Sequence, residues 1–297
     1  MFPVNPLRRM MYCRAIVREC PFTFVMKKFK VENPSDLKTF TDEHYPQGSF
    51  AFAALLRARD IRVNGVRTSK NMPLHVGDEV TYFTSPAQEA KLSHNVIFED
   101  ENVRVCDKFS GVSTEGLASE LNFNGSYFAV HRLDRNTSGV IIFAKKAAAK
   151  AELEAAFKEH RAHKTYLALC KNCFLSRGGV LTAYLFKDEK SATVRISDVP
   201  RAGYLRIVTE YQVEETMGDI ALVKLALHTG RTHQIRAQMA HIGCPVLGDE
   251  KYGDQALNKK YGARRQRLVS ASLSVEGKGV LAYLSGRVFT SSFTPTA

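Results

Sequence analysis

The stretch HRLDRNTSGVIIFAKK, residues 131–146, decides the fold. Its second half, Val140–Lys145, is apolar and β-branched without alternation, which predicts a strand buried on both faces of a sheet. Turn-forming residues at 136–139 precede that run, so Asp134 lies on a tight turn that leads into a rigid strand. Because a carboxylate at such a position is rarely left unpaired, we interpret Asp134 either as a structural ion-pair anchor or as a reactive group.

The elements around this stretch do not alternate as strand–helix–strand units. Hydrophobic periodicity predicts two strands around an acidic turn at 96–106, a strand at 165–169, a hairpin at Gly178-Gly179, longer strands at 205–215 and 219–228, and helices at 147–160 and 232–242. Long strands with a few helices favour an α+β fold on a mixed, largely antiparallel sheet.

A separate block precedes this sheet. An Ala/Leu-rich helix is predicted at 49–59, the Asn64-Gly65 pair between alternating runs predicts a hairpin, and a strand closes the block near Phe83. Basic side chains are within reach of one face of this small α/β unit and suit phosphate contacts, although a solvated charged face is the open alternative. They are Arg57, Arg59, Arg62, Arg67 and Lys70.

Composition shifts divide the chain into four parts. We expect an N-terminal extension at 1–27, a small α/β domain at 28–84, a polar linker at 85–92 and a second, larger domain at 93–297. The first 25 residues hold four arginines and one acid. We interpret them as an extension that the fold does not need, with import into an organelle as the alternative if they are a presequence.

The composition narrows the class of partner. A net charge of +12 and a pI of about 9.4 indicate a polyanion, most simply nucleic acid, with a basic surface kept for solubility as the alternative. Six scattered cysteines predict reduced thiols and a cytoplasmic location. The lone Cys170/Cys173 pair lacks the second pair of a zinc site, so no metal is expected. No apolar run is long enough to cross a membrane, so no membrane partner is expected.

Three segments carry polar groups suited to chemistry: 131–139, 163–166 and 228–236. The chain lacks the nucleophile elbow of hydrolases, the glycine-rich phosphate loops and the zinc motifs of proteases and deaminases. A glycoside hydrolase would need a second carboxylate beside Asp134. What remains is an acid, an arginine and a tyrosine in basic surroundings, which suits metal-free chemistry at a sugar–base junction in RNA.

The second part of the chain resembles the RluA-type RNA pseudouridine synthases, with matching order and spacing across most of residues 93–255. The resemblance is carried by HRLDRNTSGVIIFAKK, by HKTYLAL from 163 and by LHTGRTHQIRAQMAHIGCPVLGDEKYG from 227. It implies the pseudouridine-synthase fold and the isomerisation of uridine to pseudouridine, with no cofactor or metal. Two departures from the family pattern are Lys108-Phe109-Ser110-Gly111, where Lys-Pro is usual, and Leu268-Val269-Ser270-Ala271, where Leu-His-Ala is usual.

The resemblance also implies a role for individual residues. Asp134 matches the essential catalytic aspartate, and Arg236 matches the arginine that pairs with it. Tyr166 matches the tyrosine that contacts the target base and is a candidate base for removing the C5 proton. Ile235 matches a residue that lines the base pocket, and Arg132 matches an arginine linked to RNA engagement and nucleotide flipping.

The first block resembles the small alpha-L RNA-binding domain known from a ribosomal protein, through IRVNGVRTSKNMPLHVGDEV from residue 61. This domain ahead of such a catalytic domain is typical of enzymes that modify large-subunit ribosomal RNA, so that RNA is the expected partner of a monomeric enzyme. Transfer RNA as the substrate and a non-catalytic RNA-binding or ribosome-assembly factor are the two alternatives.

Overall fold

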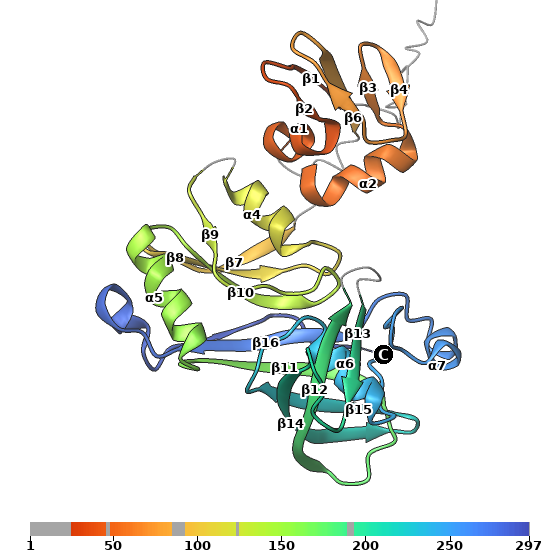
Figure 1. The fold of residues 1–297 in the computed structure, drawn as a ribbon, viewed down its shortest axis with the longest axis vertical. Helices are drawn as coiled ribbons and strands as arrows, with labels where there is room; N and C mark the ends of the chain where they lie inside the picture. Colours follow the sequence, from red (N-terminus) through yellow and green to blue (C-terminus); the bar gives the residue numbers. More distant parts are fainter. Residues whose placement is uncertain (1–24, 46–47, 85–92, 123–124, 189–192, 297) are drawn as a thin grey trace, which may run out of the picture.

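The computed structural model describes residues 25–45, 48–84, 93–122, 125–188 and 193–296, and two sheets with their helices dominate it (Figure 1). Residues 1–24 of the expected extension and the expected linker at 85–92 lie outside the described residues. The last residues of the expected extension, however, belong to the fold. Strand β1 begins at Val25 and pairs antiparallel with β6, so residues 25–27 belong to the first sheet.

The first sheet has the strand order β1-β6-β3-β4. Its strands are β1 (Val25–Lys30), β3 (Ile61–Val63), β4 (Val66–Thr68) and β6 (Glu79–Thr84), and the short pair β2 (Ser35–Asp36) and β5 (Pro73–Leu74) lies beside it. Helices α1 (Leu37–His44) and α2 (Gly48–Ala58) complete this unit. The predicted hairpin is confirmed: Asn64 and Gly65 both have positive φ, as the turn between β3 and β4 requires.

The second sheet, which we call the main sheet, has eleven strands within the described residues, in the order β13-β12-β14-β15-β11-β16-β10-β8-β7 with β17 beside β16 and β9 beside β10. The strands are β7 (His94–Glu99), β8 (Val103–Lys108), β9 (Phe128–Ala129), β10 (Ser138–Ala144), β11 (Ala162–Lys171), β12 (Gly178–Asp188), β13 (Thr193–Ser197), β14 (Leu205–Met217), β15 (Ile220–Leu227), β16 (Leu268–Val275) and β17 (Val288–Thr290). Its described pairings are antiparallel except β10 with β16, which confirms the predicted α+β class.

Strand β10 explains why its sequence shows no alternation. Ile141 and Phe143 belong to a core cluster on one face of the main sheet, which also contains residues of α4 (Thr114–Asn122) and α6 (Gln234–His241). Val140 and Ile142 belong to a second cluster on the other face, under α5 (Ala147–Lys158) and the 3₁₀ helix at Gly279–Leu284. Both faces are therefore covered, and alternate side chains of one strand supply two separate cores.

Gly139 fixes how β10 meets β16. It has a φ of +109°, and a Cβ at this position would lie 2.2 Å from the Ser270 carbonyl oxygen. These two residues are register partners in the parallel pairing, so the strands approach each other where only glycine fits. The approach places the Asp134 turn beside the start of β16, in the interior of the main sheet.

The predicted hairpin at Gly178-Gly179 is wrong. Both glycines begin β12, which pairs with β13 and β14 rather than turning back on β11. A Cβ at Gly179 would lie 3.3 Å from Cε1 of Tyr211, so this glycine makes room for an aromatic ring. A pair of glycines in a sequence can mark either a turn or a position where another group approaches the backbone closely. Here the pair marks the close approach of the Tyr211 ring.

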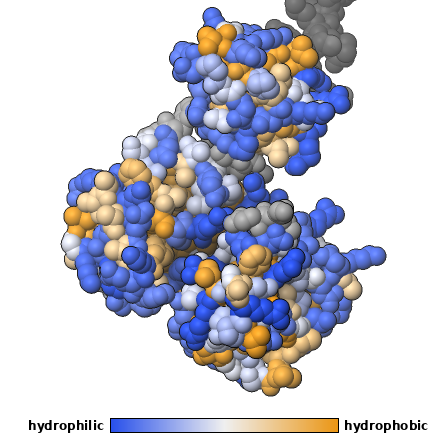
Figure 2. Space-filling view, viewed as in Figure 1, coloured by the Kyte–Doolittle hydropathy of each residue, from blue (hydrophilic) through white to orange (hydrophobic). Residues whose placement is uncertain are grey.

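Hydrophilic side chains cover most of the face seen in Figure 2, and the hydrophobic ones form small separate groups. Helix α2 of the first unit lies beside α4 of the second (Figure 1). No helix in the described part of the chain is long and apolar enough to span a membrane.

Candidate active site

The Asp134 turn is held in place by buried hydrogen bonds from two other segments. The Leu133 N–H donates to the Thr114 hydroxyl, which itself donates to the Leu133 carbonyl, both at 3.0 Å. The Thr137 N–H closes the turn on the Asp134 carbonyl at 3.0 Å. The buried Gln266 amide donates to the Thr137 hydroxyl at 2.6 Å. Backbone on both sides of Asp134 is thus fixed, which gives its carboxylate a defined direction.

A fully buried lysine supports the same turn from behind. Lys108 Nζ donates to three backbone carbonyls at 2.7–3.3 Å, and one of them belongs to Arg135. Burial lowers the pKa of Lys108 to about 7, against the attraction of the Asp134 charge. The loop after Lys108, whose sequence differs from the family pattern, is hydrogen-bonded to the turn as well. The Ser110 hydroxyl donates to the Asn136 carbonyl at 3.0 Å, and the Gly111 N–H donates to the Arg135 carbonyl at 2.8 Å.

Helix α6 carries Arg236 to the Asp134 carboxylate. Nη1 of Arg236 donates to Oδ2 of Asp134 at 2.9 Å, so the expected ion pair is present although the residues are 102 positions apart. The other edge of the guanidinium binds Asp249, with Nε to Oδ2 at 2.7 Å and Nη2 to Oδ1 at 2.9 Å. One arginine therefore holds two carboxylates, one completely buried and one at a cavity.

The electrostatics of this triad follow from burial and contact. Burial opposes the charge of Arg236, but the hydrogen bonds and charges of Asp249 and Asp134 outweigh it and raise the pKa of the guanidinium. Burial likewise opposes the Asp249 charge, but the Arg236 hydrogen bonds and charge outweigh it and hold the pKa of Asp249 below its usual value. The backbone N–H groups of Lys251 and Tyr252 also donate to Asp249, at 2.8 and 3.1 Å.

The start of α6 is built by a buried glutamine. The Gln234 side-chain oxygen accepts from the Thr229 hydroxyl at 2.9 Å and from the Arg231 N–H at 3.1 Å, which joins the end of β15 to the helix. His233 precedes the helix in the left-handed region, with a φ of 54°. This conformation places His233 Nε2 3.9 Å from Asp134 Oδ2, while its Nδ1 is 2.9 Å from the Tyr252 hydroxyl.

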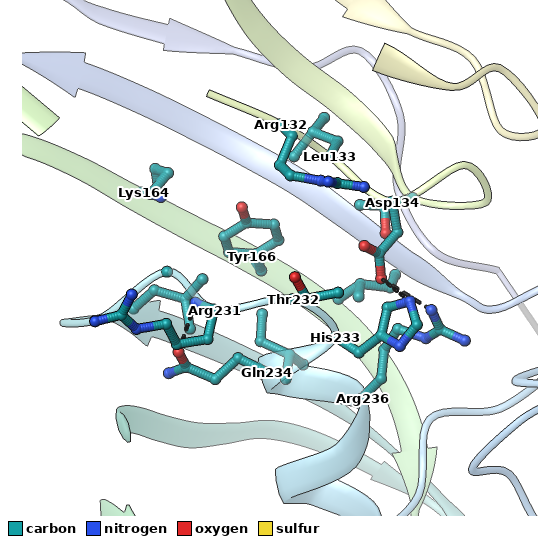
Figure 3. Close-up of a pocket in the computed structure, with 15 residues that line it drawn as sticks. Arg132, Leu133, Asp134, Lys164, Tyr166, Arg231, Thr232, His233, Gln234 and Arg236 are labelled. Carbon is teal, nitrogen blue, oxygen red and sulfur yellow. Dashed lines mark hydrogen bonds and ion pairs between the residues drawn. The ribbon is translucent and has the colours of Figure 1, made fainter. Parts of the chain in front are cut away.

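A cavity of about 100 Å³ lies in front of Asp134, and we call it the Asp134 pocket. It brings together the five residues that the sequence predicted from separate segments, namely Arg132, Asp134, Tyr166, Ile235 and Arg236. Asp134 is the one carboxylate among the described residues that line it. In Figure 3, Tyr166 lies between Lys164 and Asp134, and its hydroxyl points toward Arg132.

The pocket walls differ in exposure and charge. Tyr166 of β11 is 5% exposed and Ile235 is 4% exposed, so together they form an apolar wall. Burial raises the pKa of Tyr166, and the Asp134 charge adds to that effect. Arg132 is exposed at the mouth, where its Nη2 lies 3.8 Å from an oxygen of Glu115. The pocket therefore offers a flat apolar wall, one fixed carboxylate and an exposed cation at its opening.

The predicted RNA-binding arginines lie elsewhere, in the first unit. Arg57 and Arg59 are exposed at the end of α2, while Arg62 of β3 and Arg67 of β4 are cross-strand partners. Arg62 is half-buried, with its guanidinium carbon 4.5 Å from the centre of the Phe83 ring. None of the four lines the Asp134 pocket.

Sequence reasoning missed several members of the site, above all Asp249, His233 and Lys108. Asp249 lies within the stretch that carried the resemblance, but no spacing rule connects it with Arg236. His233 lies within the segment 228–236 that the sequence singled out, but its place beside Asp134 depends on its left-handed backbone. In the described part of the chain, no cluster of histidine, cysteine, aspartate or glutamate side chains could hold a metal ion.

Comparison with known proteins places this site in a family. The model of the RNA pseudouridylate synthase family matches residues 103–241. A ribosomal large subunit pseudouridine synthase C of Salmonella typhimurium is 32% identical over 255 residues, which cover 76% of this chain and 79% of that protein. Its counterpart in Vibrio cholerae is 30% identical over 250 residues, covering 74% and 78% respectively. The human RNA Pseudouridylate Synthase Domain Containing 1 structure has a TM-score of 0.55 at 25% identity and covers 62% of this chain and 79% of that one.

The main sheet and its helices thus have the fold of the pseudouridine synthases, a class of RNA-modifying isomerases. The chain belongs to the RNA pseudouridylate synthase family.

Proposed function

We propose that this enzyme converts uridines of large-subunit ribosomal RNA to pseudouridine, with Asp134 as its catalytic carboxylate. The observation that carries the proposal is the lone carboxylate of the Asp134 pocket, which a buried arginine holds at 2.9 Å beside an apolar wall. In the reaction the bond from N1 to ribose C1′ breaks and a bond from C5 to C1′ forms. A proton leaves C5 and N1 takes one up, so the product is an isomer of the substrate.

Arg236 and Asp249 prepare Asp134 for this role. An arginine bonded to a carboxylate favours its ionised form and fixes its direction. Because the Nε–Nη2 edge of the guanidinium is already bonded to Asp249, Nη1 is left to reach Asp134. The second oxygen of Asp134 can then face the substrate while the first stays bound. We propose Arg236 as the residue that aims the Asp134 carboxylate.

Tyr166 and Ile235 receive the base. An aromatic ring on an apolar wall can stack on a uracil that has left its own stack, which offsets part of the cost of flipping. Since burial raises the pKa of Tyr166, its phenol stays protonated at neutral pH. As the proposed acceptor of the C5 proton, it must pass its own proton on in the same step. Arg132 at the mouth is suited to the phosphate of the flipped nucleotide.

The RNA target is inferred from relatives and from charge. The relatives reported above are named as ribosomal large subunit enzymes. The exposed arginines of the first unit and the net charge of +12 suit a large structured RNA. Transfer RNA is the second candidate, and a non-catalytic assembly factor is the third. A transfer-RNA enzyme would modify uridines of transfer RNA, and a non-catalytic assembly factor would modify none.

Mapping of pseudouridines in total RNA from cells with and without the gene tests the target. We expect one or more sites in large-subunit ribosomal RNA to disappear with the gene; loss confined to transfer RNA would contradict the target. Cells that carry Asp134→Asn should lack the same sites, while purified Asp134→Asn keeps its RNA affinity. Asp198→Asn, at an exposed aspartate paired with His241, serves as the matched control. Tritium release from 5-tritiated uridine RNA by Asp134→Asn would refute the catalytic assignment.

A further inference from the structure

A second cavity, of about 270 Å³, opens directly beside the Asp134 pocket, and we call it the side cavity. The two share Arg132, Lys164, Leu227 and Gly230 as a common wall. Lys164 lies on the far side of Tyr166 from Asp134 in Figure 3, so the side cavity begins where the Asp134 pocket ends. The two cavities therefore adjoin, and these four residues form the boundary between them.

The charge of the side cavity is one-sided. Arg132, Lys164, His160 and His228 line it, and no described carboxylate does. A third cavity, of about 340 Å³, is lined by cations such as Arg132, Arg135, Arg236 and Lys251, but Asp134, Glu115 and Glu250 line it as well, so it carries charges of both signs. Phosphate is attracted by cations and repelled by carboxylates at close range. Of these two cavities, the side cavity is the one suited to a phosphodiester.

The floor of the side cavity is aromatic. The His131 and Phe157 rings are stacked at 4.6 Å between centroids, and Lys164 Nζ lies 5.4 Å from the Phe157 ring centroid. His131 Nε2 accepts a hydrogen bond from the Ile142 N–H at 3.1 Å, so the neutral ring carries its proton on Nδ1. That buried Nδ1 has no hydrogen-bond partner within the described chain. Aromatic side chains beneath a cationic rim are the combination that binds unpaired nucleotides.

We propose that the side cavity binds the nucleotide adjoining the target uridine, with its phosphate near Arg132, Lys164 and His228 and its base over Phe157. The inference rests on the proposed function, because it places the target uridine in the Asp134 pocket. It adds a second recognised nucleotide to the site. Uridines are then selected partly by whether their neighbour can leave the stack with them, which favours targets in loops over targets in continuous helices.

The test uses a pair of matched histidines. His228 at the side cavity and His241 outside it each lie beside one carboxylate, Glu210 at 3.3 Å and Asp198 at 2.8 Å. Equilibrium binding of the fluorescent pentaribonucleotide CCUCC, whose single uridine fixes the register, is measured for His228→Glu and His241→Glu. We expect His228→Glu to weaken binding about tenfold, which corresponds to about 1.4 kcal/mol. His241→Glu should change it by less than about twofold.

Two further RNAs identify the occupant. Each carries one uncharged methylphosphonate, either on the 5′ or on the 3′ side of the uridine. With one of these RNAs, His228→Glu should weaken binding by less than about twofold, because the phosphate charge that the new glutamate repels is gone. That RNA shows which neighbour the side cavity binds. An undiminished effect with both RNAs, or equal weakening by His241→Glu, would overturn the proposal. Binding does not depend on isomerisation, so failure of the proposed function would appear separately, as unmodified uridine in RNA treated with the wild-type enzyme.

Discussion

Replacement of Asp249 by asparagine tests whether the hidden carboxylate organises the active site. In the native structure Asp249 makes two charge-assisted hydrogen bonds to Arg236, at 2.7 and 2.9 Å, and its side chain is 0% exposed. An asparagine keeps one acceptor and turns an amide N–H₂ group toward the other guanidinium N–H. One hydrogen bond is then lost, and the Arg236 charge loses one of its two carboxylate partners. Breaking a buried pair in this way costs about 3–5 kcal/mol.

The released guanidinium should also move relative to Asp134. A displacement of about 1 Å at a reacting group lowers the rate on the order of 100-fold, so we expect that loss in kcat for Asp249→Asn. Urea unfolding and single-turnover isomerisation measure the two effects. Asp254→Asn is the control, since Asp254 pairs with Lys171 away from the pocket, and it should leave kcat unchanged. If Asp249→Asn keeps both its kcat within about twofold of wild type and its unfolding midpoint, the role of Asp249 is refuted.

The pH dependence of this stability has a definite sign. The pKa of Asp249 is lower in the folded protein than in the unfolded chain, where it is about 3.9. Its contribution is therefore complete above about pH 4 and is lost as the pH falls through the lower folded value. The difference in unfolding free energy between wild type and Asp249→Asn should stay constant from pH 8 to 5, and shrink below about pH 4. A difference that grows on acidification would contradict the assigned shift.

Three further predictions concern the support of the site and the first unit. Gly139→Ala should lower the unfolding free energy by more than about 3 kcal/mol, because the added Cβ would lie 2.2 Å from the Ser270 carbonyl oxygen; a soluble variant with wild-type urea midpoint would contradict this. Burial lowers the pKa of Lys108 to about 7, so above that pH Lys108 holds a proton in the unfolded chain but not in the folded protein. The unfolding free energy of wild type, relative to that of Lys108→Met, should therefore increase as the pH rises from 7 to 9. A decrease of this difference, measured by urea unfolding, would refute the prediction. Exposed Arg57 and Arg67 should each contact one phosphate, so Arg57→Ala combined with Arg67→Ala should reduce the slope of log affinity against log salt by about 2, and an unchanged slope would exclude this surface from RNA binding.

The sequence predicted what depends on local pattern. The unbroken apolar run after the Asp134 turn predicted a strand covered on both faces, because a side chain on each face must be apolar when both are buried. The Asn64-Gly65 hairpin followed from the positive φ that such turns require. The motifs also indicated Asp134, Tyr166 and Arg236 as one group, and they line a single pocket in the structure.

Tertiary structure alone decided how the reactive group is held. Asp249 reaches Arg236 because a helix and the loop after it fold back on each other, and Lys108 reaches the Asp134 turn from β8, the strand that pairs with β10. The parallel pairing of β10 with β16 joins residues about 130 positions apart through a glycine. Such contacts depend on the direction of side chains in a packed interior, which local propensity does not encode. Thus the sequence indicated the residues proposed to react, whereas packing determined the charges and hydrogen bonds that aim them.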